Sequence, residues 1–299
     1  MKALIFGVSG QDGFYLSRLL ARENIEVVGV SRINGDIKGD VVEFSFVDRL
    51  IQVHHPDYIF HFAAVSSTKH EAMFANHAAI STGTLNILEA TRIHAPQAKV
   101  FLTGSAMQFL NDGSPISEQS PFSAGNAYAV ARIQSVYAAR YFRSQIGLNV
   151  YVGYLFNHDS FLRDSRHVNR LIVDAAKSIS RGDQQFLELG DLTVQKEFNH
   201  AIDIVEAIWM LVNQSQHYEV IIGSGIAHPI EDWVAYCFAK YDLDWRQHVK
   251  MRPGFRSDYK RLVSDNSLLV SLGWKPRVSF QELADMMLDD IDTPVQRHI

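Results

Sequence analysis

Met1-Lys-Ala-Leu-Ile-Phe-Gly7 runs directly into Gly7-Val-Ser-Gly10-Gln-Asp-Gly13, and this opening stretch decides the fold. Its apolar first half predicts a buried strand, and the helical periodicity of residues 14–23 predicts a helix after the glycines. Glycine permits positive φ and close backbone approach, while a helix start offers free N–H groups and a positive dipole end to a pyrophosphate. Three glycines also occur in ordinary loops, but the strand before and the helix after them favour a dinucleotide site.

Strands and helices alternate through the first half of the chain. This alternation predicts an α/β fold with a Rossmann-type, doubly wound parallel sheet. The expected strands are residues 26–31, 58–62, 98–103 and 148–155, with helices around residue 50 and over 82–94 and 127–144. Ligands of such sheets bind at the carboxyl ends of the strands. The segments expected there are 63–66, 105–108 and 157–158.

Beyond Asn157 the pattern becomes less regular. A helix over residues 201–212 and a strand over 219–222 are expected to return to the main sheet. The sequence therefore predicts a dinucleotide-binding domain, a connecting stretch that completes it, and a smaller C-terminal substrate-binding cap. The predicted domain is 1–157, the connection is about 197–226, and the cap is 158–196 and 227–299.

Composition narrows the class of protein. The 299 residues are 47% hydrophobic and 20% charged, which is typical of a soluble globular protein. A formal net charge of -5 argues against nucleic-acid binding, and no apolar run approaches the roughly 20 residues that span a membrane. The single cysteine, Cys237, and the absence of a leader pattern favour the cytoplasm. The thirteen histidines lack metal-ligand spacing, so no metal is expected.

The second predicted strand ends at Arg32, where an NAD-binding protein usually places an acidic residue for the ribose 2′-hydroxyl. An arginine there favours the 2′-phosphate of NADP, with NAD still possible. The simpler interpretation is a solvated arginine at a strand end.

Tyr128-Ala-Val-Ala-Arg132 lies in a predicted helix, so its two functional side chains, four residues apart, share one face. Such a pair more often packs or lies at the surface than catalyses. A fixed positive charge beside a phenol stabilises the phenolate, which suits an acid/base group in hydride transfer.

These stretches together resemble the nucleotide-sugar branch of the extended short-chain dehydrogenases, most closely GDP-mannose 4,6-dehydratases and GDP-4-keto-6-deoxymannose reductases. The resemblance covers nearly the whole chain. It is carried by Gly7 to Gly13, Tyr15-Leu16, Gly83-Thr-Leu-Asn86, Ser120-Pro121, Tyr128 to Ala131, Leu155-Phe-Asn-His158, Leu189-Gly190 and Leu272-Gly-Trp-Lys-Pro276.

The resemblance implies a set of site residues. Those expected to contact the dinucleotide are Gly7, Val8, Ser9, Gly10, Gln11, Asp12, Gly13, Arg32, Phe62, Ala63, Ala64, Val65, Ser66, Tyr128, Arg132, His158 and Arg163. Those expected at the nucleotide sugar, probably a GDP-hexose in this family, are Asn157, Val168, Arg170, Lys196 and Arg256. Relatives often pair through the tyrosine helix, which implies a homodimer or homotetramer.

Three positions depart from the family pattern. Arg132 replaces the family's lysine. The family's substrate-binding serine or threonine and, two residues later, the glutamate of dehydratases match Ala106 and Gln108 here. Alanine offers no hydroxyl, and an amide accepts no proton at neutral pH. Ser105 or Thr103 is the expected substitute donor, and Gln108 either binds a sugar hydroxyl or packs in the loop.

Because reduction needs only hydride and one proton donor, the leading hypothesis is an NADP-dependent 4-keto-6-deoxyhexose reductase. In it Tyr128 donates the proton, Arg132 orients the cofactor ribose, and Ser105 or Gln108 holds the substrate. The enzyme alternatives are a 4,6-dehydratase or an epimerase with altered acid/base residues. The alternative of another class is a catalytically silent protein that binds NADP or a nucleotide sugar.

Overall fold

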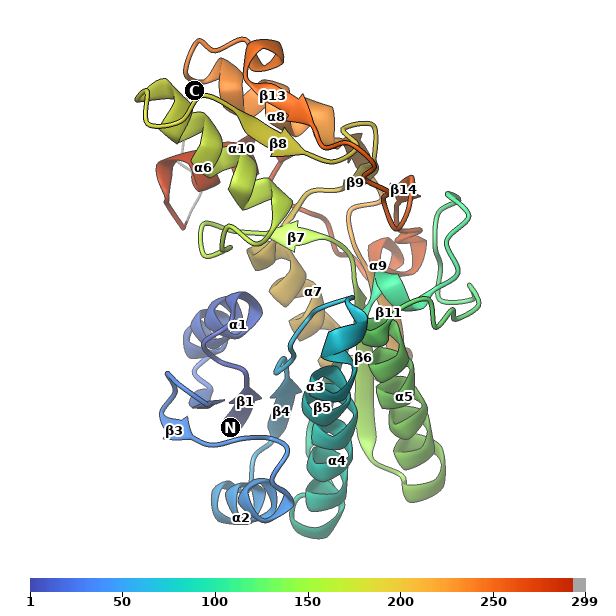
Figure 1. Ribbon diagram of the computed structural model, residues 1–299. Helices are drawn as coiled ribbons and strands as arrows, with labels where there is room; N and C mark the ends of the chain where they lie inside the picture. Colours follow the sequence, from blue (N-terminus) through green and yellow to red (C-terminus); the bar gives the residue numbers. More distant parts are fainter. Residues whose placement is uncertain (293–299) are drawn as a thin grey trace.

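A parallel seven-stranded sheet forms the centre of the computed structural model, which describes residues 1–292. Its strand order is β11-β6-β5-β4-β1-β2-β3, and every neighbouring pair is parallel (Figure 1). The strands are β1 (Lys2–Phe6), β2 (Glu26–Ser31), β3 (Ile37–Lys38), β4 (Tyr58–His61), β5 (Lys99–Ser105), β6 (Asn149–Leu155) and β11 (Glu219–Ile222). The predicted doubly wound sheet is confirmed, with the short edge strand β3 added to it.

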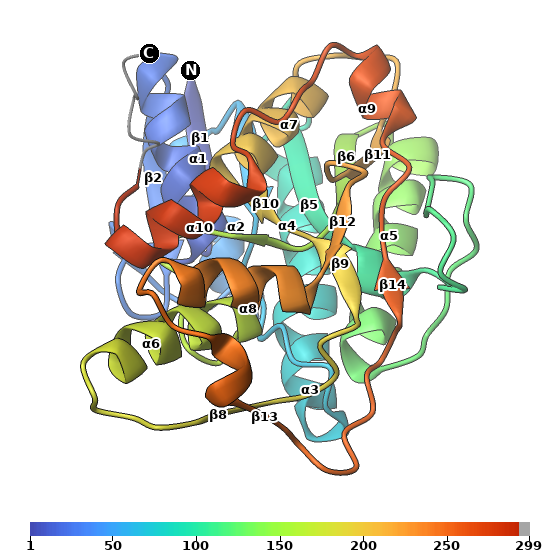
Figure 2. The same ribbon diagram turned by 90° about the horizontal axis from the view of Figure 1, so that it is seen from above.

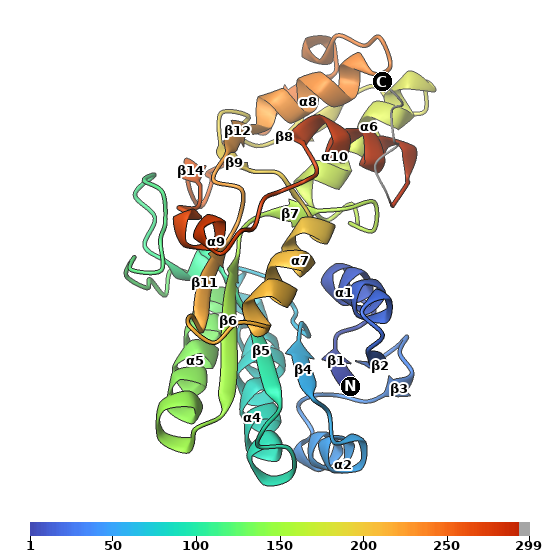
Figure 3. The same cartoon turned by 180° about the vertical axis from the view of Figure 1, so that it is seen from behind.

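Helices cover both faces of the sheet, which is why its strands are apolar on both sides. One face packs against α2 (Phe44–His54), α4 (Gly83–His94) and α5 (Ala127–Tyr141). The other packs against α1 (Gln11–Arg22) and α7 (Ala201–Val212), as Figure 3 shows from behind. The first helix begins three residues earlier than the periodicity predicted, so its first turn includes the end of the glycine motif.

Irregular helical segments flank α4 and α5. A 3₁₀ turn (His70–Ala72), α3 (Met73–Asn76) and a π-helical segment (His77–Thr82) precede α4 without a break. A second π-helical segment (Phe142–Ile146) ends the helix that carries Tyr128. The helix predicted over residues 82–94 is therefore the last part of a longer helical run.

A smaller group of elements lies above the carboxyl ends of the strands and has its own apolar core (Figure 2). Its helices are α6 (Val168–Ser180), α8 (Ile230–Ala239) and α10 (Phe280–Asp289), beside the strand pair β8 (Leu187–Leu189) and β13 (Val249–Met251). Short strands connect this group to the sheet region. They are β7 (His158–Asp159) with β10 (Asn199–His200), and β9 (Gln195–Glu197) between β12 (Ala227–Pro229) and β14 (Arg261–Leu262).

The chain returns to the sheet once more near its C-terminus. Leu269, in the short helix α9 (Ser267–Ser271), and Trp274 belong to the core beneath α1 and α7. Trp274 Nε1 donates to the Asp203 carbonyl of α7 at 3.0 Å. The predicted cap segment 227–299 thus contains a stretch that packs on the other region, and its last residues, 293–299, lie outside the described part of the chain. The domain division itself stays a prediction.

Membrane-spanning helices are not found among residues 1–292, since no helix there is both long and apolar enough to cross a bilayer.

Candidate active site

The glycine motif turns the chain tightly between β1 and α1. Gly7 has φ +92°, and a Cβ there would lie 2.8 Å from the Ala63 nitrogen. A Cβ on Gly13 would lie 2.5 Å from the Gly7 carbonyl oxygen, so α1 could not start so close to the strand with a side chain there. No side-chain hydrogen bond caps the start of α1. Its first N–H groups are therefore available to an anion, as the motif predicts.

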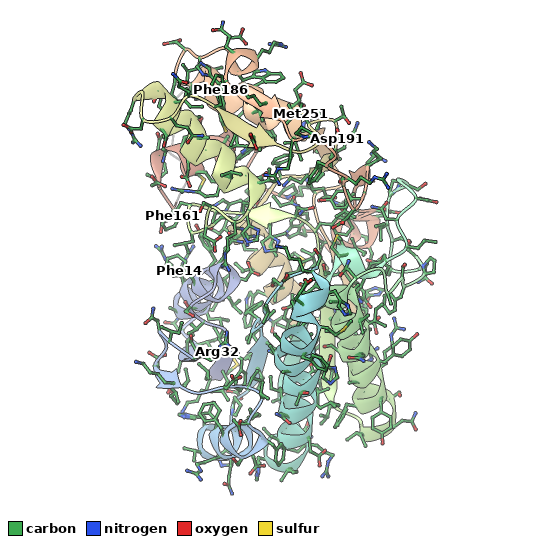
Figure 4. The ribbon with its side chains drawn as sticks, viewed as in Figure 1. Phe14, Arg32, Phe161, Phe186, Asp191 and Met251 are labelled. Carbon is green, nitrogen blue, oxygen red and sulfur yellow. The ribbon has the colours of Figure 1, made fainter. Side chains whose placement is uncertain are left out.

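A cleft opens beside this turn and is lined by eight of the seventeen residues predicted to contact the dinucleotide. They are Gly7, Ser9, Gly10, Arg32, Phe62, Ala63, Ala64 and Val65, joined by Ser31, Asp40 and Ala79 among others. The Ser9 and Ser31 hydroxyls are 2.8 Å apart across its mouth. Arg32, which directly follows β2, is labelled in Figure 4. We call this space the dinucleotide cleft.

A second space of about 420 Å³ lies between the carboxyl ends of β5 and β6 and the upper group of elements. We call it the central cavity. Its walls include these predicted site residues: Asp12, Phe62, Ser66, Ser105, Tyr128, Arg132, Asn157, His158, Arg163, Val168 and Lys196. The structure therefore brings residues that lie far apart in the chain into one site.

Tyr128 and Arg132 meet in this cavity as their helical spacing predicts. The Arg132 guanidinium lies 4.9 Å from the centre of the Tyr128 ring, a cation–π contact. Arg132 is only 3% exposed, and its Nη1 donates to the Thr103 carbonyl oxygen. Asn126 fixes the start of the helix, because its Oδ1 accepts from the Ala129 N–H at 2.9 Å. Among residues 1–292 the Arg132 cation is thus held by a backbone carbonyl and an aromatic ring, and no carboxylate there forms an ion pair with it.

Ala106 and Gln108, which match the family's hydroxyl and glutamate positions, lie in a 3₁₀ turn, Ala106–Gln108, that follows the end of β5 at Ser105. Ser105, Ala106 and Met107 line the central cavity, whereas Gln108 is fully buried and is not part of the cavity wall. Gln108 Oε1 accepts from the Ser105 N–H at 2.9 Å, so it closes the turn. At this turn the cavity therefore presents the Ser105 hydroxyl, the Ala106 methyl group and the Met107 thioether.

Charged side chains join the glycine turn to the chain that leaves β6. His158 Nε2 lies 2.9 Å from Asp12 Oδ1, and Arg163 Nε donates to Asp159 Oδ1 at 2.7 Å. Burial tends to raise the pKa of Asp12, but His158 and then Arg163 lower it to about 2. Burial alone would lower the pKa of His158, yet the Asp12 carboxylate raises it. Both carboxylates are thus committed to ion pairs.

Lys196 lies on the boundary between the central cavity and an outer cavity. The outer cavity is lined by Val168, Leu189 to Leu192, Lys196, Arg256 and Tyr259 among others. Burial lowers the pKa of Lys196 to about 8, against the opposing effect of Asp159. Val168 and Lys196 therefore line both cavities, and Arg256 lines the outer one.

Arg170 does not fit its predicted role at the substrate. Its guanidinium pairs with Asp174 at 2.8 Å and with Asp290 at 2.6 Å, on α6 and at the end of α10. It lines neither of these two cavities. The residue holds two helices of the upper group together, because two carboxylates satisfy its fork of donors.

Several wall residues escaped the sequence analysis. Asp159, His167, Asn169 and Tyr259 line the central cavity. Asp159 directly follows Asn157-His158, so its place in the site could have been predicted from the sequence. Tyr259 comes from a distant loop, and only the fold brings it near Asn157.

Known proteins resemble this chain over nearly its whole length. The sequence profile described as "GDP-mannose 4,6 dehydratase" matches residues 4–287. The chain belongs to this family. Two relatives from Arabidopsis thaliana, GDP-mannose 4,6 dehydratases 1 and 2, are 29% and 30% identical to it; each alignment covers 96% of this chain, and 89% and 86% of the relatives respectively. The predicted resemblance is confirmed.

Solved structures agree on the fold. RMD from Pseudomonas aeruginosa complexed with NADPH superposes with a TM-score of 0.85 at 20% identity, covering 97% of this chain and 96% of that one. UDP-glucose 4-epimerase from Thermus thermophilus, complexed with NAD, gives 0.84 at 20% identity, covering 97% and 98%. These solved structures therefore share the fold of this chain.

Proposed function

We propose that this protein reduces a 4-keto-6-deoxyhexose carried on a nucleoside diphosphate, with NADPH as the reductant. GDP is the first nucleotide to test, because the relatives are named for GDP-mannose. The observation that carries the choice of reduction is the cavity wall at the end of β5. There Ser105 offers a hydroxyl, whereas Ala106 and Met107 offer no group that could transfer a proton.

Elimination of water from a hexose needs an acid/base group for the C5 proton and the departing C6 hydroxyl. Among the described residues, the wall of the central cavity contains two carboxylates, Asp12 and Asp159. Burial tends to raise the pKa of Asp159, but the positive charges of Arg163 and Lys196 have the larger effect and lower it. Asp12 is paired with His158. Neither carboxylate is free to act as that base. Reduction requires one proton donor, which Tyr128 supplies.

Tyr128, Arg132 and Ser105 have separate roles in the proposed reduction. Bound NADPH supplies the hydride. Tyr128 Oη donates a proton to the oxygen that becomes an alkoxide, and Arg132 stabilises the phenolate left behind. The Ser105 hydroxyl accepts from the Met107 N–H at 3.2 Å, so its own proton remains free for the same substrate oxygen.

The cofactor follows from the dinucleotide cleft. The absence of a side chain at Gly7 lets a pyrophosphate come close to the backbone. Arg32 and the Ser9 and Ser31 hydroxyls line the same cleft and could bind a 2′-phosphate. NADP is therefore the proposed cofactor, and NAD the second to test.

The nucleotide sugar is proposed to lie across both upper spaces. Its hexose occupies the central cavity near Tyr128, its diphosphate meets Lys196, and its base enters the outer cavity beside Arg256. A homodimer or homotetramer remains the proposed assembly.

Two alternatives keep specific support. The relatives' names favour a GDP-mannose 4,6-dehydratase, and epimerases are among the similar folds. The replacement of lysine by the buried Arg132, together with Met107, favours a silent binder of NADP or a nucleotide sugar.

The deciding experiment adds GDP-4-keto-6-deoxymannose to the purified protein with NADPH and follows NADPH absorbance and product mass. Loss of one NADPH per ketosugar, abolished in Tyr128→Phe, supports the reductase. Loss of one water from GDP-mannose without net NADPH consumption would instead identify a dehydratase. Tight NADPH binding with neither reaction would support the silent binder.

A further inference from the structure

Gly190 directly follows β8 and lines the outer cavity. Its φ lies outside the left-handed region, so its backbone conformation does not require glycine. A Cβ at this position would instead meet a single side chain. Its three nearest atoms would be ring carbons of Phe255, at 2.4, 2.5 and 2.7 Å. The Phe255 ring therefore occupies the space that a side chain at position 190 would need.

Phe255 belongs to the loop between β13 and β14. Gly254, whose φ is +70°, turns the chain just before it. Phe255 lines the outer cavity and is 46% exposed, although phenylalanine is usually buried. Its ring thus rests against the backbone of Gly190 while much of the residue's surface stays open to a ligand.

The outer cavity adjoins the place proposed for the diphosphate, because Val168, Lys196 and Tyr259 line both cavities. A nucleotide sugar whose diphosphate meets Lys196 places its base in the outer cavity. Every nucleobase has a π-face that stacks on an aromatic ring. The other apolar side chains that line this cavity include those of Leu192, Val194 and Ile230.

We propose that Phe255 is the surface on which the nucleobase stacks, and that Gly190 is a positioning residue that leaves room for the ring. The placement of a base in the outer cavity rests on the proposed function. The binding of a nucleoside diphosphate tests it without any turnover.

The test is a double-mutant cycle between Gly190 and Phe255, read as dissociation constants by isothermal titration calorimetry with GDP, ADP and UDP. Phe255→Ala should weaken the nucleotide that the wild type binds best by about tenfold. Phe255→Leu, which fills similar space without a π-face, should weaken it nearly as much. Gly190→Ala should cause a loss of about fivefold or more, because the new methyl group displaces the ring. In the Phe255→Ala background, Gly190→Ala should add less than about a twofold loss, since the clash is gone.

Phe186→Ala is the matched control. Phe186, labelled in Figure 4, is similarly exposed at 43% and does not line the outer cavity. Its replacement should leave nucleotide binding unchanged. The affinity for NADPH should change less than about twofold in every variant, which checks that each one folds.

Full nucleotide affinity in Phe255→Leu would overturn the stacking role, and equal losses from Gly190→Ala in both backgrounds would overturn the role of Gly190. A wild type that binds none of the three nucleoside diphosphates would overturn the proposal together with the proposed nucleotide-sugar substrate. Nucleotide binding that depends on Phe255, in a protein that reduces no ketosugar, would support the stacking role and refute only the reductase.

Discussion

His158 Nε2 lies 2.9 Å from Asp12 Oδ1, and this contact ties the first turn of α1 to the segment that leaves β6. The two residues are 146 positions apart in the chain. Arg163 donates from the same segment to Asp159 and to the His158 carbonyl, so four titratable side chains, with Asp12 and His158 included, stabilise the junction. Above it, Phe161 faces Phe14 of α1, with ring centres 6.4 Å apart (Figure 4).

The Asp12–His158 pair should stabilise the fold in a defined pH range. The raised pKa of His158 means that its contribution is complete below its unfolded value, about 6.5, and is lost as pH rises through the raised value. The lowered pKa of Asp12 means that its contribution is present above about 3.9 and is lost as pH falls toward 2. Asp12→Asn should therefore reduce the free energy of unfolding by about 1–3 kcal/mol near pH 5.5 and by less at pH 9. Melting temperatures of both proteins across pH check this, and a deficit that does not change with pH would contradict it.

Arg32 should select NADPH over NADH. Arg32→Ala removes the guanidinium from the dinucleotide cleft and should weaken NADPH binding about 10–100-fold, with NADH changed little, because only NADPH carries the 2′-phosphate. Fluorescence titration with both cofactors measures the ratio. Arg22→Ala, an exposed arginine at the end of α1, is the control. An equal loss for both cofactors would show that Arg32 contacts something other than the 2′-phosphate.

Lys196 should bind the diphosphate only while it is protonated. Since its pKa is lowered to about 8, affinity for GDP should fall as pH rises from 7 to 9. Lys196→Met should weaken GDP binding about tenfold or more at pH 7 and abolish the loss between pH 7 and 9. Isothermal titration calorimetry measures both, with the exposed Lys250→Met on β13 as control. Retention of the pH dependence in Lys196→Met would assign it to another group.

Gln108 should matter for stability and not for the substrate. Gln108→Ala removes the acceptor of the Ser105 N–H and should cost about 1–3 kcal/mol of unfolding free energy. The KM for the sugar should change less than about twofold, because the side chain does not reach the cavity. A large rise in the KM of Gln108→Ala for the sugar, with no loss of unfolding free energy, would show that Gln108 binds the sugar.

The sequence predicted the sheet and the dinucleotide cleft because both depend on local signals. Gly7 and Gly13 mark a turn whose spacing alone demands small residues, and the apolar composition of the strands indicates their burial. Tyr128 and Arg132 were placed together by helical periodicity.

Residues whose role depends on where an element ends were not predictable. Gln108 was matched to a catalytic position, but the strand ends at Ser105 and the turn that follows buries the Gln108 side chain outside the cavity wall. Arg170 was expected at the nucleotide sugar, but its guanidinium pairs with Asp174 and Asp290. Asp174 lies one helical turn away, at i,i+4, whereas Asp290 belongs to a distant segment that no periodicity in the sequence indicates.

Met107 leads to the sharpest distinction between reductase and dehydratase. Its side chain lines the central cavity next to Gln108, the position at which the family resemblance places the dehydratases' glutamate. The wild type should therefore release no water from GDP-mannose. Met107→Glu restores an acid/base group and should produce a measurable product lighter by one water, at a cost of about 1–3 kcal/mol of stability for a half-buried carboxylate. Met107→Gln has the same size without an ionisable group and should produce none. Mass spectrometry of the nucleotide sugars separates the cases, and water loss by the wild type itself would mean that another group of the cavity carries out the elimination.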